Sequence, residues 1–390
     1  MGHGNSRVKP NILIAPGPYK ECLAAVDVAN AMLRGIRQLL PEATAVLQPI
    51  CDGGSGFVDT LTTLTSGRII PLSVHGPCGE MINSRYGVLG DGSTAAIESA
   101  AACGLALVPR ESRNPRWMST YGVGELIRHA ICETGCRRIF VGCGDSATND
   151  CGIGCATALG VRFFADDQEI VFPKAEDLAR ITRIDDSRVI RELGGTTFTV
   201  AGNLTSVLCG PEGTSRIYGP QKGASTEDVE YLSAAVDHFV DLLFYAKNID
   251  LSFLPGAGGA GGLAASLYAF CNARLSYSFD VIHKFAHLEE YLAECSLVLT
   301  GEGCADDRTA TGKVACAVAL RAKKYGVPVV AIVGSIAQDH EDIFYNGIDA
   351  VEPITEGPMT IDESMRTAQD LIERATTRVV RFIFNIGSRV

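Results

Sequence analysis

Short apolar runs alternate with helix-like periodicity at the start of the chain. Asn11 to Ala15 and Ala45 to Ile50 have the length and composition of strands. Each is followed by a segment with apolar residues at helical spacing, over Cys22 to Leu40 and over Phe57 to Leu64. The pattern predicts two successive units of strand, loop and helix.

The same alternation returns near the end of the chain. β-Branched runs at residues 296–300, 327–333 and 350–354 predict strands, and helices are expected between and after them, near 313–325 and 361–380. Strands that alternate with helices form parallel sheets. The two ends of the chain are therefore expected to share one parallel-sheet domain.

The middle of the chain has a different pattern of apolar and polar residues. Residues 69–97 form short alternating segments broken by glycines, which is typical of antiparallel strands with tight turns. Further on, the pattern predicts a helix over Tyr121 to Cys132, a strand over Arg138 to Gly142 and a helix over Ile153 to Leu159. This change in the residue pattern indicates a separate domain.

Length and composition agree with a two-domain α/β protein. A chain of 390 residues exceeds the size at which one core usually keeps growing, and 46% hydrophobic residues suffice for large cores. The expected division places residues 1–73 and 291–390 in the parallel-sheet domain and residues 74–290 in an inserted α/β domain.

The charge and cysteine content exclude several classes of protein. A net charge of -11 removes the electrostatic basis for nucleic-acid binding, although a few local groups can still hold a nucleotide. The 14 cysteines are scattered and lack the CxxC pairs of a zinc site, so they are expected to be reduced thiols. No apolar run predicts a signal peptide or a membrane span, so a cytoplasmic protein is expected.

Four loops follow predicted strands, where ligands of parallel sheets gather. The first contains Lys20, a cation suited to a transferred phosphoryl group. The second, DGGSG, contains Asp52 beside Gly53 and Gly54, which allow close backbone approach to a ligand. A solvated lysine and a simple turn are the alternatives for these two loops.

The third and fourth loops are rich in polar groups. GCGDSATNDCG, residues 142–152, has five polar side chains directly after an apolar strand, too many for burial without a ligand or ion. The fourth, residues 301–313, contains Glu302, Asp306 and Lys313, and carboxylates at this density suit Mg²⁺. It is not a Walker A motif, because Val314 stands where Ser or Thr should bind magnesium.

Two glycine patterns keep a dinucleotide-binding alternative open. Residues 256–261 fit G-x-G-x-x-G, and residues 142–147 fit G-x-G-x-x-A after a strand. Against the second pattern, the polar cluster continues through Asp150, where a Rossmann helix should already be apolar. His283 and His287 have the i, i+4 spacing of zinc ligands, but residue 284 is Lys rather than part of a zincin motif.

Collinear motifs extend over nearly the whole chain. They are IAPGPYKECLAA, DGGSGF, VHGPCGE, AAIESAAACGLALVP, STYGVGELIRHA, GCGDSATNDCG, YGPQKGA, LPGAGGAGGL and LVLTGEG. In this set the chain resembles the type I glycerate kinase family, which phosphorylates D-glycerate with ATP, usually to 2-phosphoglycerate. The resemblance implies a Rossmann or flavodoxin-like parallel-sheet domain with a mixed α/β domain inserted, and an active site in the cleft.

The resemblance also implies ATP and Mg²⁺ as cofactors and a set of site residues. The candidate catalytic residues are Asp150, Lys20 and Asp52, with Asp150 as the preferred base. The candidate binding residues are Gly53, Gly54, Ser146, Thr148, Asn149, Lys222 and Lys313. The candidate metal ligands are Asp52, Glu302 and Asp306. The expected partners are a small-molecule substrate and ATP, in a monomer or homodimer.

The sequence departs from the family pattern in several loops, among them residues 305–308 of the fourth loop and the loop 203–210. Gly17 and Pro18 replace Asp-Ser in the first loop, and Ser55 and Phe57 replace Glu and Thr in the second. These departures suggest a different acceptor, a sugar acid or a cyclitol, as an alternative to glycerate. A NAD-dependent oxidoreductase and a relative that binds without catalysis are further alternatives.

Overall fold

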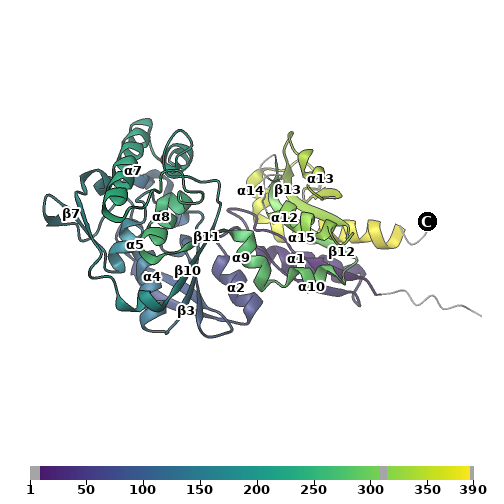
Figure 1. Ribbon diagram of the computed structural model, residues 1–390. Helices are drawn as coiled ribbons and strands as arrows, with labels where there is room; N and C mark the ends of the chain where they lie inside the picture. The colour runs from purple at the N-terminus through teal and green to yellow at the C-terminus, as the bar shows by residue number, and fades with distance from the viewer. Residues whose placement is uncertain (1–8, 307–308, 310–313, 387–390) are drawn as a thin grey trace, which may run out of the picture. The chain divides into compact units, whose positions relative to one another are not determined.

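The computed structural model describes residues 9–306, 309 and 314–386, and the chain divides into two compact units (Figure 1). Unit 1 comprises residues 1–51 and 282–390, and unit 2 comprises residues 52–281. The expected architecture, a parallel-sheet domain made from both chain ends and an inserted mixed α/β domain, is confirmed.

The boundaries differ from those expected. The first lies after residue 51 rather than 73, because strand β3 (Arg68–His75) pairs with the next strand, β4 (Met81–Val88), inside unit 2. Helix α2 (Phe57–Thr65) packs against the same strands. The second boundary lies after residue 281 rather than 290, within helix α9 (Ser278–Phe285).

Unit 1 contains a five-stranded sheet in which every neighbouring pair is parallel. Its strands are β1 (Asn11–Ile14), β2 (Thr44–Leu47), β12 (Leu297–Ala305), β13 (Val329–Ile336) and β14 (Ala350–Pro353). Their spatial order, β14-β13-β12-β1-β2, is that of flavodoxin-like sheets. The order reverses between β1 and β12, and ligands of such sheets bind at that point.

Helices cover this sheet. They are α1 (Ala25–Leu39), α10 (Leu288–Leu292), α12 (Val314–Lys323), α13 (Asp342–Tyr345), α14 (Ile361–Arg366) and α15 (Ala368–Val380), followed by a π-helical segment, Arg381–Ile386. Helices α1 and α15 form one core with the sheet through residues such as Met32, Ile36 and Ile372. At Gly35 of α1 a Cβ would lie 2.4 Å from the Glu373 carbonyl oxygen, so glycine permits this close helix pair.

Unit 2 is built on a six-stranded mixed sheet of order β11-β10-β6-β5-β4-β3. Its other strands are β5 (Thr94–Glu98), β6 (Arg138–Gly142), β10 (Thr197–Gly202) and β11 (Arg274–Tyr277). The first four strands in this order, β11, β10, β6 and β5, are parallel to one another, whereas β4 pairs antiparallel with both β5 and β3. The carboxyl ends of the parallel strands therefore lie at one edge, which is called the acidic edge below for the carboxylates described there.

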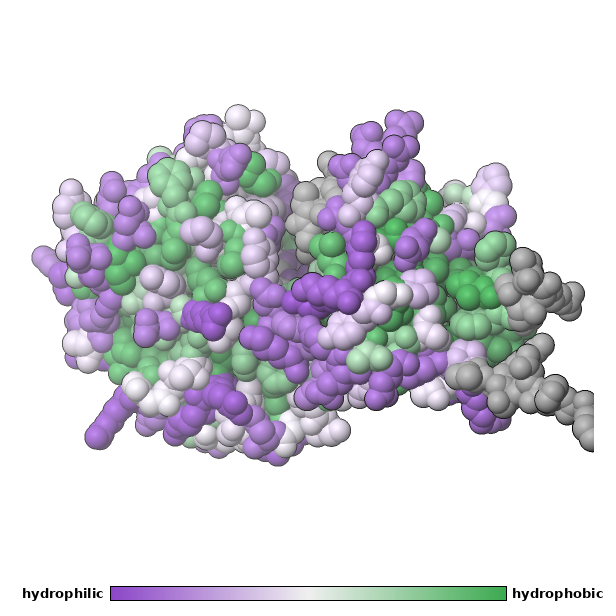
Figure 2. Space-filling model, turned by 45° about the vertical axis from the view of Figure 1, so that its right-hand side comes forward, coloured by the Kyte–Doolittle hydropathy of each residue, from purple (hydrophilic) through white to green (hydrophobic). Residues whose placement is uncertain are grey.

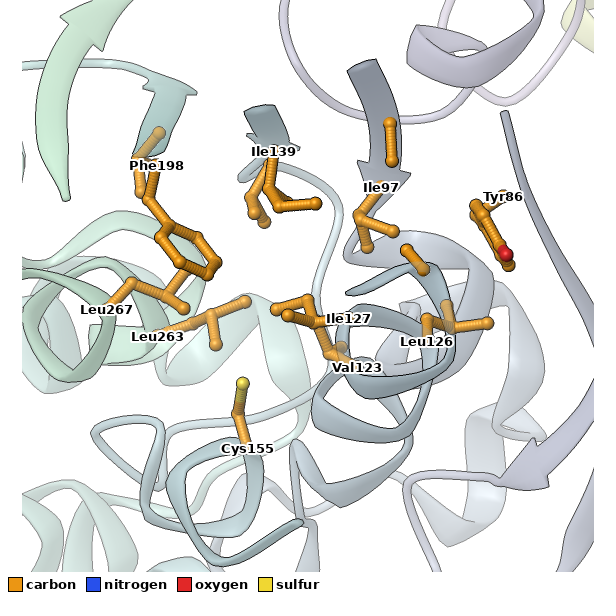
Figure 3. Close-up of a cluster of buried hydrophobic side chains, with 14 of the residues drawn as sticks. Tyr86, Ile97, Val123, Leu126, Ile127, Ile139, Cys155, Phe198, Leu263 and Leu267 are labelled. Carbon is orange, nitrogen blue, oxygen red and sulfur yellow. The ribbon is translucent and has the colours of Figure 1, made fainter. Parts of the chain in front are cut away.

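One face of the six-stranded sheet is covered by three helices, α4 (Tyr121–Cys132), α5 (Ile153–Ala158) and α8 (Gly259–Cys271). Figure 3 shows Ile97, Ile139 and Phe198 of neighbouring strands pointing toward side chains of α4 and α8 such as Ile127 and Leu263. Alternate strand residues face the helices, as the pleat requires. Helix α2 covers the opposite face at β3, β4 and β5.

The remaining elements of unit 2 form a second core. They are β7 (Arg162–Ala165), β8 (Gln168–Glu169), β9 (Arg183–Asp185), α6 (Thr214–Tyr218) and α7 (Thr226–Lys247), and β8-β7-β9 form a small antiparallel sheet. Phe163, Phe239 and Leu178 pack together in this core. The short helix α3 (Ala100–Cys103) packs instead into the core of the six-stranded sheet. Figure 2 shows hydrophilic residues spread over the visible face of each unit, and no helix in the described part of the chain is long and apolar enough to cross a membrane.

Candidate functional site

Two of the four candidate loops meet at the acidic edge of unit 2. A Cβ on Gly53 would lie 2.6 Å from the Ala201 carbonyl oxygen at the end of β10, and Gly53 has a φ of 86°. A Cβ on Gly144 would lie 2.6 Å from the Cα of Gly54. Only glycines allow this contact, so the loop 52–56 and the loop 142–152 are in direct backbone contact.

Two carboxylates converge where these loops touch. The position that a Cβ of Gly54 would occupy is 2.4 Å from Asp145 Oδ2 and 3.2 Å from Asp52 Oδ1. Asp145 is exposed and has a φ of 52°, a left-handed conformation that is uncommon for residues other than glycine. Such backbone strain is characteristic of functional sites, where the surrounding structure maintains it.

The backbone amides at the start of α2 are occupied by the protein's own carboxylates. Asp52 Oδ1 accepts a hydrogen bond from Gly54 N (3.2 Å), and Asp145 Oδ2 accepts one from Ser55 N (2.9 Å). Glu98 Oε2 accepts from Gly56 N (2.9 Å) and Val58 N (3.2 Å). A helix N-terminus attracts anions, and here carboxylates of the protein take that position. Carboxylates of three segments thus surround the start of α2, and Asp52 and Asp145 among them suit a cation or the proton of a hydroxyl group.

Glu98 is the buried member of this set. It ends strand β5 and is 8% exposed. Burial raises the pKa of Glu98 to about 7, and the hydrogen bonds from Val58 and Gly56 oppose that rise.

The inner end of the loop 142–152 is buried and saturated with hydrogen bonds. Asp150 is fully buried, and its Oδ2 accepts from Thr120 N (2.8 Å), Thr120 Oγ1 (2.8 Å) and Gly154 N (3.2 Å). Its Oδ1 accepts from Gly152 N (3.0 Å). Burial raises the pKa of Asp150, and these four donors oppose that rise. Asp150 therefore joins the starts of α4 and α5, a structural arrangement.

Lys222 supplies a positive charge inside the same loop. Its Nζ donates to Ser146 Oγ (3.0 Å) and to the Thr148 carbonyl oxygen (2.7 Å), and the lysine is 5% exposed. Burial lowers the pKa of Lys222 to about 8, and the charge of Asp150 opposes that decrease. The expectation that this polar cluster needs a ligand or ion for its burial is wrong for Asp150 and Ser146, because protein groups form hydrogen bonds with both.

Asn149 is fully buried at the centre of the loop. Its Nδ2 donates to Ser215 Oγ (2.7 Å), and its Oδ1 has no hydrogen-bond partner in the described part of the chain. Gly261 and Gly262, with φ of 69° and 90°, lie against the loop, and a Cβ on Gly261 would be 2.0 Å from the Thr148 carbonyl oxygen. The G-x-G-x-x-G pattern at 256–261 thus follows a loop rather than a strand, and its glycines support the loop 142–152.

In unit 1, the loop after β1 lies against β12 at the point where the strand order reverses. Gly17 N donates to the Gly301 carbonyl oxygen (2.8 Å), and a Cβ on Gly303 would lie 3.6 Å from Lys20 N. Lys20 is exposed, whereas Glu302 is 8% exposed. Tyr19 fixes this loop, since its buried hydroxyl donates to the Ile332 carbonyl oxygen of β13 (2.8 Å). The structure therefore brings the backbone of Lys20 next to the strand segment that contains Glu302.

The remaining candidates of the fourth loop have a local role or are not described. Asp306 Oδ1 accepts from Thr309 N (3.0 Å) and Thr309 Oγ1 (3.1 Å), and Thr309 Oγ1 accepts from Asp306 N (3.0 Å). Lys313 lies outside the described residues. Across residues 9–306, 309 and 314–386, no group of three or more His, Cys, Asp or Glu side chains is placed to hold a metal ion.

The candidate metal ligands are divided between the units. Asp52 belongs to unit 2, and Glu302 and Asp306 belong to unit 1. Within unit 2, the partner of Asp52 is Asp145, which sequence reasoning placed in the polar loop without giving it a role. Glu98 was not singled out, although its position at the end of the run Ala95–Glu98, where an acid follows apolar residues, was a usable signal.

Comparison with known proteins adds a family match over most of the chain. A family model described as the glycerate kinase family matches residues 12–384. A glycerate 2-kinase of Escherichia coli K12 is 42% identical over 369 residues, which cover 94% of this chain and 96% of that protein. A glycerate kinase of Halalkalibacterium halodurans is 38% identical over 368 residues, 94% of this chain and 97% of that protein.

A solved structure has the same fold. It is a crystal structure of a protein from Salmonella typhimurium LT2 that is named as a glycerate kinase 2. It is 37% identical in sequence, superposes with a TM-score of 0.84, and covers 98% of this chain and 100% of its own.

Proposed function

Because the chain belongs to the glycerate kinase family, we propose that it transfers the γ-phosphoryl group of ATP to D-glycerate and forms 2-phosphoglycerate. The chain is a small-molecule kinase, as its relatives are named. We assign the activation of the acceptor hydroxyl group to the acidic edge of unit 2. The observation that carries it is the convergence of Asp52 and Asp145 at Gly54.

Asp145 is the proposed base that takes the proton of the substrate hydroxyl. It is exposed, its Oδ2 is held by Ser55 N, and its backbone is maintained in a left-handed conformation. In phosphoryl transfer a positioned carboxylate accepts this proton, while most of the rate comes from orientation and charge stabilisation. Asp145 replaces Asp150 in this role, because four donors already surround the buried Asp150 carboxylate.

Asp52, beside the proposed base Asp145, fits a Mg²⁺ ion. Magnesium in kinases is bound by one or two carboxylates, and waters and phosphate oxygens complete its shell. When bound, Mg²⁺ neutralises charge on the phosphates. Glu302 and Asp306 of unit 1 stay proposed metal-binding groups.

Lys20 stays the proposed cation for the transferred phosphoryl group, since it is exposed and follows the interior strand β1 at the reversal of strand order. Gly53 and Gly54 allow the two loops to touch, and Ser146, Thr148, Asn149 and Lys222 hold the loop 142–152 in place. The protein is proposed to act in the cytoplasm as a monomer or homodimer.

A coupled assay with ATP and Mg²⁺ tests this function. The purified protein is offered D-glycerate, L-glycerate, sugar acids and cyclitols, and the product is identified by phosphorus NMR. Turnover is expected to be most efficient with D-glycerate, with 2-phosphoglycerate as product. A higher kcat/KM for a sugar acid or cyclitol would support the alternative acceptor suggested by Ser55 and Phe57.

Two further results would change the assignment of function. ATP binding without turnover of any acceptor would indicate a relative that binds without catalysis. Tight binding of NAD in place of ATP would favour the oxidoreductase alternative, against which the family match stands.

A further inference from the structure

We propose that Glu98 and Ser99, consecutive residues at the end of β5, are positioning residues that fix the separation of Asp52 and Asp145. Each residue holds one of the two loops that contain those carboxylates. The inference rests on the proposed function of the acidic edge.

Glu98 fixes the loop that contains Asp52. Its Oε2 accepts from Gly56 N at 2.9 Å and from Val58 N at 3.2 Å, so one oxygen spans the junction between the loop 52–56 and α2. The side chain is buried, and its position is determined by the strand that it ends. The location of the loop is thereby linked to the central part of the sheet.

Ser99 fixes the loop that contains Asp145. Its Oγ donates to the Gly144 carbonyl oxygen (3.1 Å) and accepts from Gly144 N (3.3 Å), and Ser99 N donates to the Gly142 carbonyl oxygen (3.0 Å). Ser99 is fully buried. Asp145 follows Gly144 directly, so this hydroxyl determines where the strained Asp145 backbone begins.

Glu98 and Ser99 both act on the distance between Asp52 and Asp145. Residues 98 and 99 are joined by one peptide bond, so the two loops are held from neighbouring points, the last residue of β5 and the residue that follows it. A hydrogen bond from Ser55 N to Asp145 Oδ2 (2.9 Å) also joins the two loops directly. A functional site needs its groups held within about half an ångström, and a second layer of hydrogen bonds provides this.

The test measures kcat and the Mg²⁺ concentration for half-maximal activity in Glu98→Gln and Ser99→Ala. Glutamine keeps the shape but offers a neutral oxygen to two amides, and alanine removes the hydrogen bonds to Gly144. Each variant is expected to lower kcat about tenfold and to raise the Mg²⁺ requirement severalfold. Assays are made well below the thermal midpoint of each variant, so that all the enzyme is folded.

Asp91→Asn is the matched control. Asp91 precedes the other end of β5, and its Oδ1 accepts from two backbone amides, Ser93 N and Thr94 N, both at 2.9 Å. It therefore caps the same strand away from the acidic edge. Its kcat and Mg²⁺ requirement are expected to equal those of the wild type, even if its thermal midpoint falls.

A double-mutant comparison separates positioning from a general structural role. In the Asp145→Asn background, Ser99→Ala is expected to lower kcat less than twofold further, since the group that Ser99 positions has lost its function. An equal tenfold loss in both backgrounds, or full activity and normal Mg²⁺ dependence of Glu98→Gln and Ser99→Ala, overturns the inference. If one variant does not fold, the other carries the test.

Failure of the proposed function gives a different result. If Asp145→Asn and Asp52→Asn both keep wild-type kcat, the acidic edge is not the reacting site, and the positioning proposal falls with it. If these two variants lose activity while Glu98→Gln and Ser99→Ala keep it, the function stands and only the inference is overturned.

Discussion

The two ends of the loop 142–152 contain aspartates in opposite environments. At the outer end, Asp145 is exposed and its backbone is left-handed. At the inner end, Asp150 is fully buried and accepts four hydrogen bonds, with Lys222 holding the segment between them. A dense run of polar residues thus contains one group placed to meet a ligand and several that hold it there. The predictions below separate these two kinds of residue.

The largest effect is expected from Asp150→Ala. The change leaves the amides of Thr120, Gly152 and Gly154 without an acceptor and removes a charge that favours ionised Lys222. The free energy of unfolding should fall by on the order of 3–5 kcal/mol. Urea denaturation measures it, and Asp241→Ala, an exposed position on α7, is the control. A decrease in the unfolding free energy of less than about 1 kcal/mol would contradict the structural role assigned to Asp150.

Asp145→Asn should instead lower activity and leave stability unchanged. Asparagine tolerates the left-handed backbone and keeps an oxygen for Ser55 N, but it is a poor proton acceptor. We expect kcat to fall about 100-fold, a typical general-base contribution. Steady-state kinetics and thermal unfolding measure the two quantities. A kcat within threefold of wild type excludes Asp145 as the base.

Lys222 should make stability depend on pH. Its pKa falls from 10.5 to about 8 on folding, so above pH 8 the unfolded chain binds more protons than the folded protein. Stability from this group therefore rises with pH, by on the order of 1.5 kcal/mol between pH 8 and 9.5. The quantity to measure is the unfolding free energy of the wild type minus that of Lys222→Met across this range. The cysteine thiols also titrate in this range, and their contribution is the same in the two proteins and cancels in the difference. A flat difference contradicts the charge assigned to Lys222.

Gly54→Ala should give the smallest effect of the four. The added Cβ would lie 2.4 Å from Asp145 Oδ2 and 3.2 Å from Asp52 Oδ1, so the two carboxylates must move apart. We expect kcat to fall about tenfold, because a small misplacement of reacting groups costs this much or more. Gly194→Ala is the matched control, since nothing lies within 4 Å of its added Cβ. Equal activity of the two variants would mean that the spacing of the carboxylates is unimportant.

The local patterns of the sequence predicted the elements that support the site. The helix expected over Tyr121 to Cys132 and the strand over Arg138 to Gly142 have the observed bounds. Apolar periodicity is strong in both segments, and their ends are set by neighbouring residues. The meeting of the loops 52–56 and 142–152 was not predicted, because the expected division placed residues 1–73 and residues 74–290 in different domains.

The roles of individual polar residues could not be predicted in this way. Asp150 is buried because Thr120, thirty positions earlier, supplies two donors to it, and no local pattern contains that contact. Lys222 reaches the Thr148 carbonyl oxygen from 74 positions later. The first domain boundary failed for a related reason, since α2 repeats the strand, loop and helix pattern of unit 1 but packs against β4 and β5.

The nesting of unit 2 within unit 1 has a consequence for synthesis of the chain. Strand β1 is an interior strand of its sheet, and its neighbour β12 is made only after all of unit 2, since Ile12 pairs with Leu297. At about 5–20 residues per second, β1 waits on the order of 15–60 s for this partner. Unit 2 is contiguous and can fold on the ribosome in that interval. Once unit 2 has folded, the two segments of unit 1 are joined by a structured domain rather than by a long flexible loop. The entropy lost when β1 pairs with β12 is therefore smaller.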